Sequence, residues 1–471
     1  MIKVATLGLT LQNETSNVLD KLKKVDHAVL ISYSSKIETI DPLAFFKSGV
    51  GKRFFWSDPD QEMTLVGLGQ ELAVVTHQKD RGRYQDIHEK WEHIKNRSFH
   101  FQEDGNVMQS AVGPLLFGGF SFDPLKKKEK HWHDYQEGAF FIPSKMLTKT
   151  TDATFITMNK WVRPYENVHH VLDQLISAVK KLTTFPIHDE RAEHQQYDKK
   201  AELHVDEWLE AIRHATTDIQ KGKYDKVVLA REILLSFREP IQLYRVISHL
   251  LCEQTSSYIF ALEEKGKCFV GASPERLIKK VDDKVLSTCL AGSIQRGQTE
   301  REDQMLGLEL LHDKKNVMEH EFVVDMIHQA FSRYCVYVEK PTAPELYKTK
   351  SVQHLYTPII GQMSKKYSLF DFIEKLHPTP ALGGDPQKTA LEVIRSIEPM
   401  SRGWYAGPIG WLDSRDNGEF AVAIRSGLIN SHQARLFAGC GIVRDSDPLQ
   451  EYEETQIKLK PMLSALGGDP S

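Results

Sequence analysis

KVVLAREILLSF, residues 226–237, is a run of β-branched and apolar residues that predicts a β-strand. Three more short runs follow, at 258–262, 268–271 and 276–290, and turns containing Gly, Asp or Lys separate them. Such close spacing is typical of antiparallel hairpins. Just before the first strand, residues 208–220 have helical spacing. This part of the chain therefore predicts antiparallel sheet next to helix.

Further along the chain the pattern changes to helix and then back to strand. Residues 303–334 have helical spacing, residues 405–443 form a second group of strand-like runs, and a helix is predicted at the end. Runs of strands separated by helical blocks, in place of strict β-α-β alternation, predict a layered α+β fold with antiparallel sheets flanked by helices.

A polar connection divides the chain into two unequal parts. His, Asp, Glu, Gln and Lys crowd together at 188–200 with almost no large apolar residue, which indicates an exposed segment. Residues 1–187 mix strand-like and helical runs, and we expect this α/β part to complete the fold. Residues 201–471 carry the residues that suggest chemistry.

Composition excludes several classes of protein. The 60 Lys and Arg residues are outnumbered by 64 Asp and Glu residues, so the basic excess of a nucleic-acid-binding protein is missing. The five cysteines are odd in number and contain no CxxC pair, which favours a reducing compartment. No apolar run resembles a signal peptide or reaches the roughly 20 residues of a membrane span. We expect a cytoplasmic protein without a membrane or nucleic-acid partner.

Glu319 stands out in the long helical stretch. Phe322, Val323 and Met326 follow it at i+3, i+4 and i+7, which places this carboxylate on an apolar stripe. A buried carboxylate needs a cation or several hydrogen bonds to offset its desolvation. A metal ion, an arginine partner and an end of the stripe that is open to solvent all explain the pattern.

Two further places carry unusual charges. In the last helix, Asp447 and Pro448 suit its first positions, and Pro461 is expected to end or kink it. Glu454 and Lys458 lie one turn apart on it, a spacing that usually indicates a surface ion pair. In the strand-like run 420–428, Arg425 alternates with small residues, which leaves room for an anion or for an internal salt bridge.

Several motifs together resemble those of the chorismate-utilising enzymes, over roughly residues 203–466. They occur in the family's order: Lys226-Val-Val-Leu-Ala-Arg231, Gly271-Ala-Ser-Pro-Glu-Arg276, Leu290-Ala-Gly-Ser293, Glu319-His320, Val352-Gln-His-Leu355, His377-Pro-Thr-Pro-Ala381, Arg425 and Gly439-Cys-Gly-Ile-Val443. Residues before about 187 resemble the family only loosely.

Three positions select a subgroup within this resemblance. Lys226 stands where the ammonia-using members carry glutamine, and Ala291 stands where aminodeoxychorismate synthases carry a nucleophilic lysine. The segment 377–381 is similar to that of the isochorismate and salicylate subgroup, and Gly383-Gly384-Asp385-Pro386 looks like the menaquinone branch. The resemblance thus implies an isomerase that adds water at C2 of chorismate and removes the C4 hydroxyl, for menaquinone biosynthesis.

The resemblance also implies roles for single residues. Lys226 is expected to activate water as the general base, and Glu275 to protonate the departing hydroxyl. Glu319 and Glu454 match the ligands of Mg²⁺, the expected cofactor. The residues expected to contact substrate are Gly292, Ser293, Ala381, Arg425, Gly439 and Lys458.

Two alternatives remain open at the level of sequence. A salicylate synthase would form isochorismate in the same pocket and then eliminate pyruvate. A protein that binds chorismate without turning it over would be a different class, although Lys226, Glu275, Glu319 and Glu454 are all present. Because Lys226 favours water over ammonia, no obligate glutaminase subunit is expected.

Overall fold

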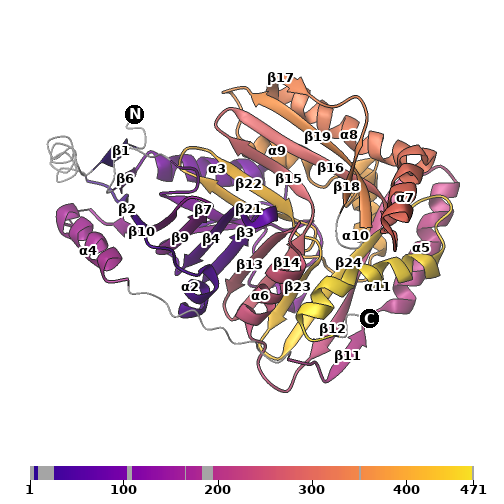
Figure 1. Ribbon diagram of the computed structural model, residues 1–471, viewed down its shortest axis with the longest axis horizontal. Helices are drawn as coiled ribbons and strands as arrows, with labels where there is room; N and C mark the ends of the chain where they lie inside the picture. Colours follow the sequence, from indigo (N-terminus) through magenta and orange to yellow (C-terminus); the bar gives the residue numbers. More distant parts are fainter. Residues whose placement is uncertain are drawn as a thin grey trace.

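The computed structural model describes residues 5–8, 26–102, 109–164, 166–182, 195–348 and 352–468. Within these ranges the strands form two sheets, of fourteen and ten strands, with helices on their outer faces (Figure 1). Among these residues, no helix is long and apolar enough to cross a membrane. The predicted layered α+β fold is confirmed.

The larger sheet contains strands from both parts of the chain. In spatial order they are β1 (Ala5–Gly8), β6 (Ser98–Gln102), β2 (Val29–Ile37), β10 (Thr154–Val162), β9 (Lys145–Thr150), β4 (Met63–Leu68), β3 (Arg53–Ser57), β13 (Tyr258–Glu264), β14 (Lys267–Ser273), β23 (Ser426–Asn430), β24 (Gln433–Ile442), β12 (Lys226–Ser236) and β11 (Lys199–Glu202), with β20 (Gly384–Asp385) also beside β12. Strand β6 pairs in parallel with β1 and β2, whereas the other pairs are antiparallel.

The smaller sheet has the same mixed origin. Its strands are β17 (Cys335–Glu339), β19 (Val352–Met363), β16 (Lys284–Gln295), β15 (Arg276–Val281), β22 (Gly418–Val422), β21 (Pro408–Asp413), β7 (Leu115–Phe120), β8 (Gly138–Ile142) and β5 (Leu72–Thr76), with β18 (Glu345–Lys348) also beside β19. The pairs β3–β13 and β7–β21 join the N-terminal strands to the C-terminal ones.

The helices cover the two sheets from outside. They are α2 (Pro42–Ser48), α3 (Gly82–Lys95), α4 (Val168–Lys180), α5 (Val205–Gln220), α6 (Leu243–Glu253), α7 (Glu300–His312), α8 (Lys314–Tyr334), α9 (Leu369–Leu376), α10 (Gln387–Ile397) and α11 (Pro448–Ala465), with short 3-10 turns at Pro59–Gln61 and Lys130–Trp132. Helices α5, α7 and α11 lie together at one end of the molecule, and α4 lies at the other (Figure 1).

Strand alternation builds the core between the sheets. On β3, Phe54 and Trp56 join a cluster that includes residues of both sheets, while Phe55 points to the opposite side and packs with the outer helices. Phe54 stacks on Phe117 of β7, with ring centroids 4.0 Å apart. Aromatic contacts of this kind hold the two sheets face to face.

Two segments of the chain cross between the sheets side by side. One runs from the larger sheet to the smaller, and the other runs back. The chain passes from β14 to β15 through Pro274 and Glu275, and from β22 to β23 through residues 423–425. The backbone N–H of residue 272 donates to the carbonyl of Arg425 (3.0 Å), and that of residue 422 donates to the carbonyl of Glu275 (3.1 Å). These hydrogen bonds keep the two crossing segments adjacent.

Some of the predicted strands, helix ends and caps are confirmed, and others are wrong. The strands and hairpins between 226 and 290 are present, and Asp447 caps α11 by accepting from the backbone N–H of Leu449 and Gln450. The stretch 303–334 is two helices, because Asp313 ends α7 and caps α8. Helix α11 does not end at Pro461 but continues to residue 465.

The prediction of a single strand at 420–428 was wrong. Residues 418–422 and 426–430 belong to different sheets, and Arg425 has a left-handed backbone (φ 51°) at the bend between them. Of the predicted connection at 188–200, residues 188–194 lie outside the described ranges, and Lys199 and Lys200 belong to β11.

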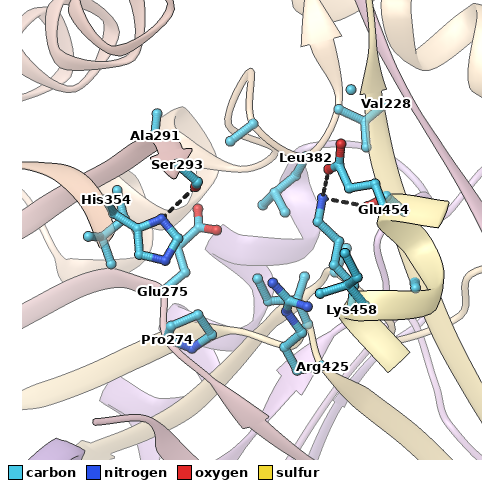
Figure 2. A pocket seen from close by; sticks show the side chains of 18 of the residues that line it. Val228, Pro274, Glu275, Ala291, Ser293, His354, Leu382, Arg425, Glu454 and Lys458 are labelled. Carbon is cyan, nitrogen blue, oxygen red and sulfur yellow. Dashed lines mark hydrogen bonds and ion pairs between the residues drawn. The ribbon is translucent and has the colours of Figure 1, made fainter. Parts of the chain in front are cut away.

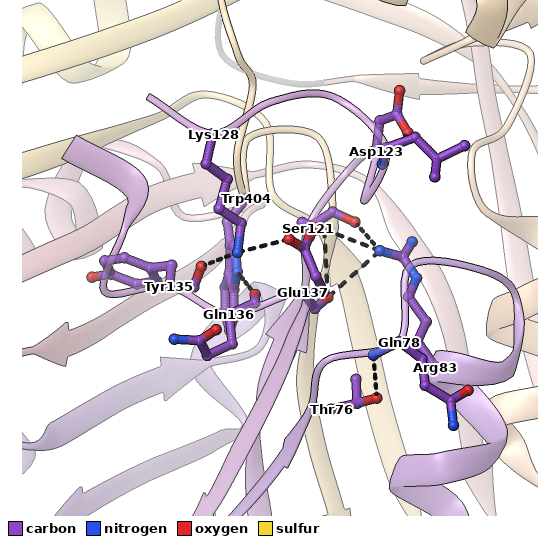
Figure 3. Close-up of polar contacts among 11 residues, drawn as sticks. Thr76, Gln78, Arg83, Ser121, Asp123, Lys128, Tyr135, Gln136, Glu137 and Trp404 are labelled. Atoms are coloured by element: carbon purple, nitrogen blue, oxygen red, sulfur yellow. Dashed lines mark hydrogen bonds and ion pairs between the residues drawn. The ribbon is translucent and has the colours of Figure 1, made fainter. Parts of the chain in front are cut away.

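A buried polar network ties α3 to the smaller sheet (Figure 3). The Arg83 guanidinium donates to the carbonyl and hydroxyl oxygens of Ser121 (2.9 and 3.0 Å). The Ser121 hydroxyl in turn donates to the carboxylate of Glu137 (2.6 Å), which also pairs with the Lys128 ammonium (3.0 Å). Glu137 is therefore the counter-charge of Lys128, and its carboxylate is linked to Arg83 through the Ser121 hydroxyl.

Replacing Glu137 by glutamine should lower the free energy of unfolding by about 3 kcal/mol, because it leaves the largely buried Lys128 ammonium without a counter-charge and weakens the acceptor of the Ser121 hydroxyl. Urea denaturation measures the change. The matched control is Glu89→Gln on the exposed face of α3, which should change stability by less than about 0.5 kcal/mol. Equal losses in the two variants would contradict the assignment of Glu137.

Candidate active site

A cavity of about 550 Å³ opens where the paired crossing segments run between the sheets. Its walls come from both sheets, from α8 and α11, and from the segment after α9. All ten residues expected from the sequence line it: Lys226, Glu275, Gly292, Ser293, Glu319, Ala381, Arg425, Gly439, Glu454 and Lys458. Residues separated by more than 200 positions in the chain thus share one site.

Glu275 and Arg425 come from the two crossing segments. Figure 2 shows Glu275, Ser293 and His354 on one side of the cavity, Glu454 and Lys458 on the other, and Arg425 between them. Within the described residues, the Arg425 guanidinium has no hydrogen-bond partner, and burial lowers its pKa. A cation in this position is suited to bind an anionic ligand.

Glu275 is set up to hold a proton near neutral pH. Desolvation by the surrounding protein raises the pKa of its carboxyl to about 7. Two neighbouring groups oppose this shift in pKa: the hydroxyl of Thr379 and the Lys458 ammonium. A carboxyl that titrates near pH 7 can act as a general acid.

Lys226 begins β12 and points into the cavity. Its ammonium lies 3.7 Å from the carboxylate of Glu319 on α8. The neighbouring strand makes room for this side chain at Gly441, where an added Cβ would come within 2.9 Å of the lysine Cε. A larger residue at that position would push the amine out of place.

Glu319 does not lie on an apolar stripe as expected. Val323 is buried, but Phe322 is 46% exposed, and the Glu319 side chain is 32% exposed at the cavity wall. The buried face of α8 is formed instead by Val323, Val324, Ile327, Ala330 and Phe331. The carboxylate therefore has access to a ligand.

Helix α11 brings a second lysine–glutamate pair to the cavity. The Lys458 ammonium lies 2.5 Å from the Glu454 carboxylate and donates to the carbonyl of Gly439 (3.0 Å). On the same helix, one carboxylate oxygen of Glu451 is buried without a hydrogen-bond partner in the described residues, and burial raises its pKa. Both helices thus present carboxylates to the same space.

Several cavity residues were missed as site residues. His354, although part of a quoted motif, was given no role; its Nδ1 lies 2.7 Å from the Ser293 hydroxyl, and burial lowers its pKa to about 4. Asn316, Arg402, Tyr405 and Glu451 also line the cavity. The alternation of side chains along β19 predicts which residues share a face with His354. No local sequence pattern indicates which of the two faces meets the cavity.

The segment that carries Ala381 is attached to the strand of Lys226. Within it, β20 pairs with the start of β12, and the N–H of Val228 donates to the carbonyl of Gly383 (2.9 Å). Gly384 has φ 123°, and a Cβ there would lie 2.2 Å from the carbonyl oxygen of Lys226. Only glycine allows the two segments to approach this closely.

The carboxylates could hold a small divalent cation. Mg²⁺ prefers oxygen ligands and often takes one or two protein carboxylates together with water and substrate oxygens. Glu319 and Glu454 offer such oxygens, and each of these carboxylates forms an ion pair with a lysine in this structure. The described residues contain no group of three or more His, Cys, Asp or Glu side chains arranged to hold a metal, so water and substrate would have to complete the coordination.

Comparisons with known proteins show the family of this chain. A family model described as "Chorismate binding enzyme" matches residues 16–467. The isochorismate synthase MenF of Bacillus subtilis is 57% identical over 471 residues, which cover 99% of each chain. The salicylate biosynthesis isochorismate synthase of Pseudomonas aeruginosa is 32% identical over 97% of this chain and 95% of its own.

Solved structures show the same fold at lower identity. The menaquinone-specific isochorismate synthase MenF from Escherichia coli matches with a TM-score of 0.76 and 24% identity, over 97% of this chain and 99% of that one. Anthranilate synthase component I from Streptococcus pneumoniae matches with a TM-score of 0.70 and 19% identity, over 85% and 92%. The fold is thus shared by an isochorismate synthase and an anthranilate synthase component. The family model and the full-length relatives show that this chain belongs to the family of chorismate-binding enzymes.

Proposed function

We propose that this protein is an isochorismate synthase, an isomerase that converts chorismate to isochorismate. The observation that carries the proposal is the content of the cavity. Lys226, the Glu275 carboxyl with a pKa of about 7, and Arg425, whose guanidinium has no hydrogen-bond partner among the described residues, all line it. The identity to full-length isochorismate synthases supports the same reaction.

Lys226 and Glu275 share the proton transfers. In its neutral amine form, Lys226 takes a proton from water as the water oxygen attacks C2 of chorismate, and the ring double bonds shift. Glu275 gives a proton to the C4 hydroxyl, which leaves as water, so no atom or charge is gained overall. The raised pKa of Glu275 suits the acid role, because the carboxyl is partly protonated near neutral pH.

The remaining cavity residues orient the substrate. Chorismate carries two carboxylates, and Arg425 and Lys458 are the cations placed to meet them. Gly439 and Gly292 bring backbone close to the ligand, while Ser293 and Ala381 complete the wall. Holding both carboxylates aligns C2 and C4 with the two catalytic groups, which is a large part of what an active site contributes.

We propose Glu319 and Glu454 as the ligands of Mg²⁺. One oxygen of Glu451, which lines the same cavity and has no hydrogen-bond partner in the part of the chain that the structure describes, supports a positive charge at this place. When bound, the ion would hold the ring carboxylate of the substrate and neutralise its charge. The lysines that balance the two glutamates would then be free to face water and substrate.

The pathway, the nucleophile and the cellular compartment are also part of the proposal. Supply of isochorismate to menaquinone biosynthesis is supported by the motif at 383–386 and by the relative with 57% identity, which is named MenF like the menaquinone-specific enzyme of Escherichia coli. We propose that water, not ammonia from a glutaminase subunit, is the nucleophile, because Lys226 occupies the base position. The five unpaired cysteines support a reducing compartment such as the cytoplasm.

The reaction is tested by incubating the purified protein with chorismate and Mg²⁺ or with EDTA, and resolving the products by chromatography. We expect isochorismate alone, formed reversibly, without glutamine, and only with Mg²⁺. Accumulation of salicylate and pyruvate would identify a salicylate synthase instead. Untouched chorismate would favour a binding protein without catalysis.

Replacing Lys226 by glutamine should lower kcat for isochorismate formation by about 100- to 10,000-fold, because the general base is lost. The matched control is Lys223→Gln, a nearby lysine that is 57% exposed and pairs with Asp218. Its activity should equal that of the wild type. A Lys226→Gln enzyme with normal kcat would remove Lys226 from the mechanism.

Replacing Glu275 by glutamine should abolish activity and stabilise the protein above pH 7. Since burial raises the pKa of Glu275 from 4.5 to about 7, the wild-type fold loses stability as the pH rises through this window, whereas glutamine does not titrate. The variant should gain up to about 3 kcal/mol at pH 8 and less than about 1 kcal/mol at pH 5, by urea denaturation. An exposed control, Glu210→Gln, should show no such pH dependence; a Glu275→Gln variant that behaved like it would contradict the raised pKa.

A further inference from the structure

One edge of β12 is only partly paired. On one side the strand pairs with β24 over residues 227–236. On the other side β20 covers Lys226 and Val227, and β11 covers Ile233–Ser236. Backbone bonds extend these contacts to the N–H of Val228, which donates to Gly383, and to the carbonyl of Glu232, which accepts from Leu203. Within the described chain no strand pairs with residues 229–231 on that side, close to the lysine that enters the cavity.

Two buried side chains bind the backbone at this gap. The carboxylate of Glu398 accepts from the N–H of Ala230 (2.8 Å), and the guanidinium of Arg402 donates to the carbonyl of Val228 (2.7 Å). The two side chains also form an ion pair (2.7 Å) and are 1% and 3% exposed. They make the contacts to β12 that a neighbouring strand would otherwise make.

Arg402 extends the same contact to a second part of the site. Its Nη1 donates to the carbonyl of Leu382 (3.0 Å), the residue after Ala381. Although Arg402 lines the cavity, most of its N–H groups are already directed at Glu398 and at the two carbonyls. Arg425, by contrast, has its guanidinium free in the described structure, so the two cavity arginines differ in what they can bind.

We propose that Arg402 and Glu398 are a positioning pair for catalysis, which replaces the missing strand at this gap and holds Lys226 and the Ala381 segment at the cavity wall. The proposal rests on the proposed function for its catalytic part. Arg402 is then not a substrate ligand, despite its charge and its place. Its loss should affect the rate of the chemical step more than the binding of chorismate.

The test compares Arg402→Lys with Arg395→Lys. Arg395 forms a similar two-point contact with Asp123 (2.8 and 3.2 Å) but bonds neither β12 nor the Ala381 segment. A lysine at 402 keeps the charge but cannot reach Glu398, Val228 and Leu382 together. We expect kcat to fall about 100-fold with KM changed less than about threefold, while Arg395→Lys stays within about twofold of the wild type.

Hydrogen exchange of the peptide 226–232 provides a readout that needs no activity. Exchange should be faster in Arg402→Lys than in Arg395→Lys, because Ala230 loses a well-placed acceptor. If Arg402→Lys does not fold, Glu398→Gln, which keeps an oxygen for Ala230, should show the same pattern with a smaller loss of kcat.

Other results would overturn the proposal. A raised KM with unchanged kcat would make Arg402 a substrate ligand, and equal behaviour of the 402 and 395 variants would remove its positioning role. If the wild type and Arg395→Lys both fail to form isochorismate, the proposed function fails. Even in that case, hydrogen exchange tests the positioning pair separately. Equal exchange of the peptide 226–232 in Arg402→Lys and Arg395→Lys would show that Arg402 and Glu398 do not hold β12.

Discussion

The paired crossing of two chain segments between the sheets is the constraint on which this structure depends. Each segment carries one functional side chain, Glu275 or Arg425, and backbone hydrogen bonds keep the segments side by side. Because both strands change sheet at the same point, the sheets separate there and leave space that side chains of neither sheet fill. The cavity is therefore a consequence of topology, and its chemistry comes from whichever residues border the crossing.

Charge is distributed around this cavity in compensated pairs. Lys226 faces Glu319, Lys458 faces Glu454, and Arg402 is neutralised by Glu398. The groups that find no partner among the described residues lie where a ligand is expected, most clearly Arg425 and one oxygen of Glu451. Burial of an ionisable carboxyl such as Glu275 costs stability, and such costs are common at sites shaped for catalysis. The rest of the fold must offset them.

The N-terminal part contributes to the architecture of the site without lining it. Its strands continue both sheets through the pairs β3–β13 and β7–β21, so the C-terminal strands are not left with open edges there. The buried network around Glu137 and the stacking of Phe54 on Phe117 hold this extension together. If the part before residue 188 were removed from the rest of the chain, both sheets would lose strands that pair with the C-terminal ones.

The sequence by itself determined the elements with strong local patterns and, by resemblance, the family and the ten residues that meet in the cavity. The strand at 226–236 and the cap of α11 were predictable because alternation and capping act over a few residues. Only the tertiary structure decided that 420–428 splits between two sheets, that Glu319 faces a cavity, and that Glu398 and Arg402 complete an edge of β12. Each of these depends on which distant segments become neighbours, such as Ile259 beside Ser57, and local sequence patterns carry no record of such long-range pairing.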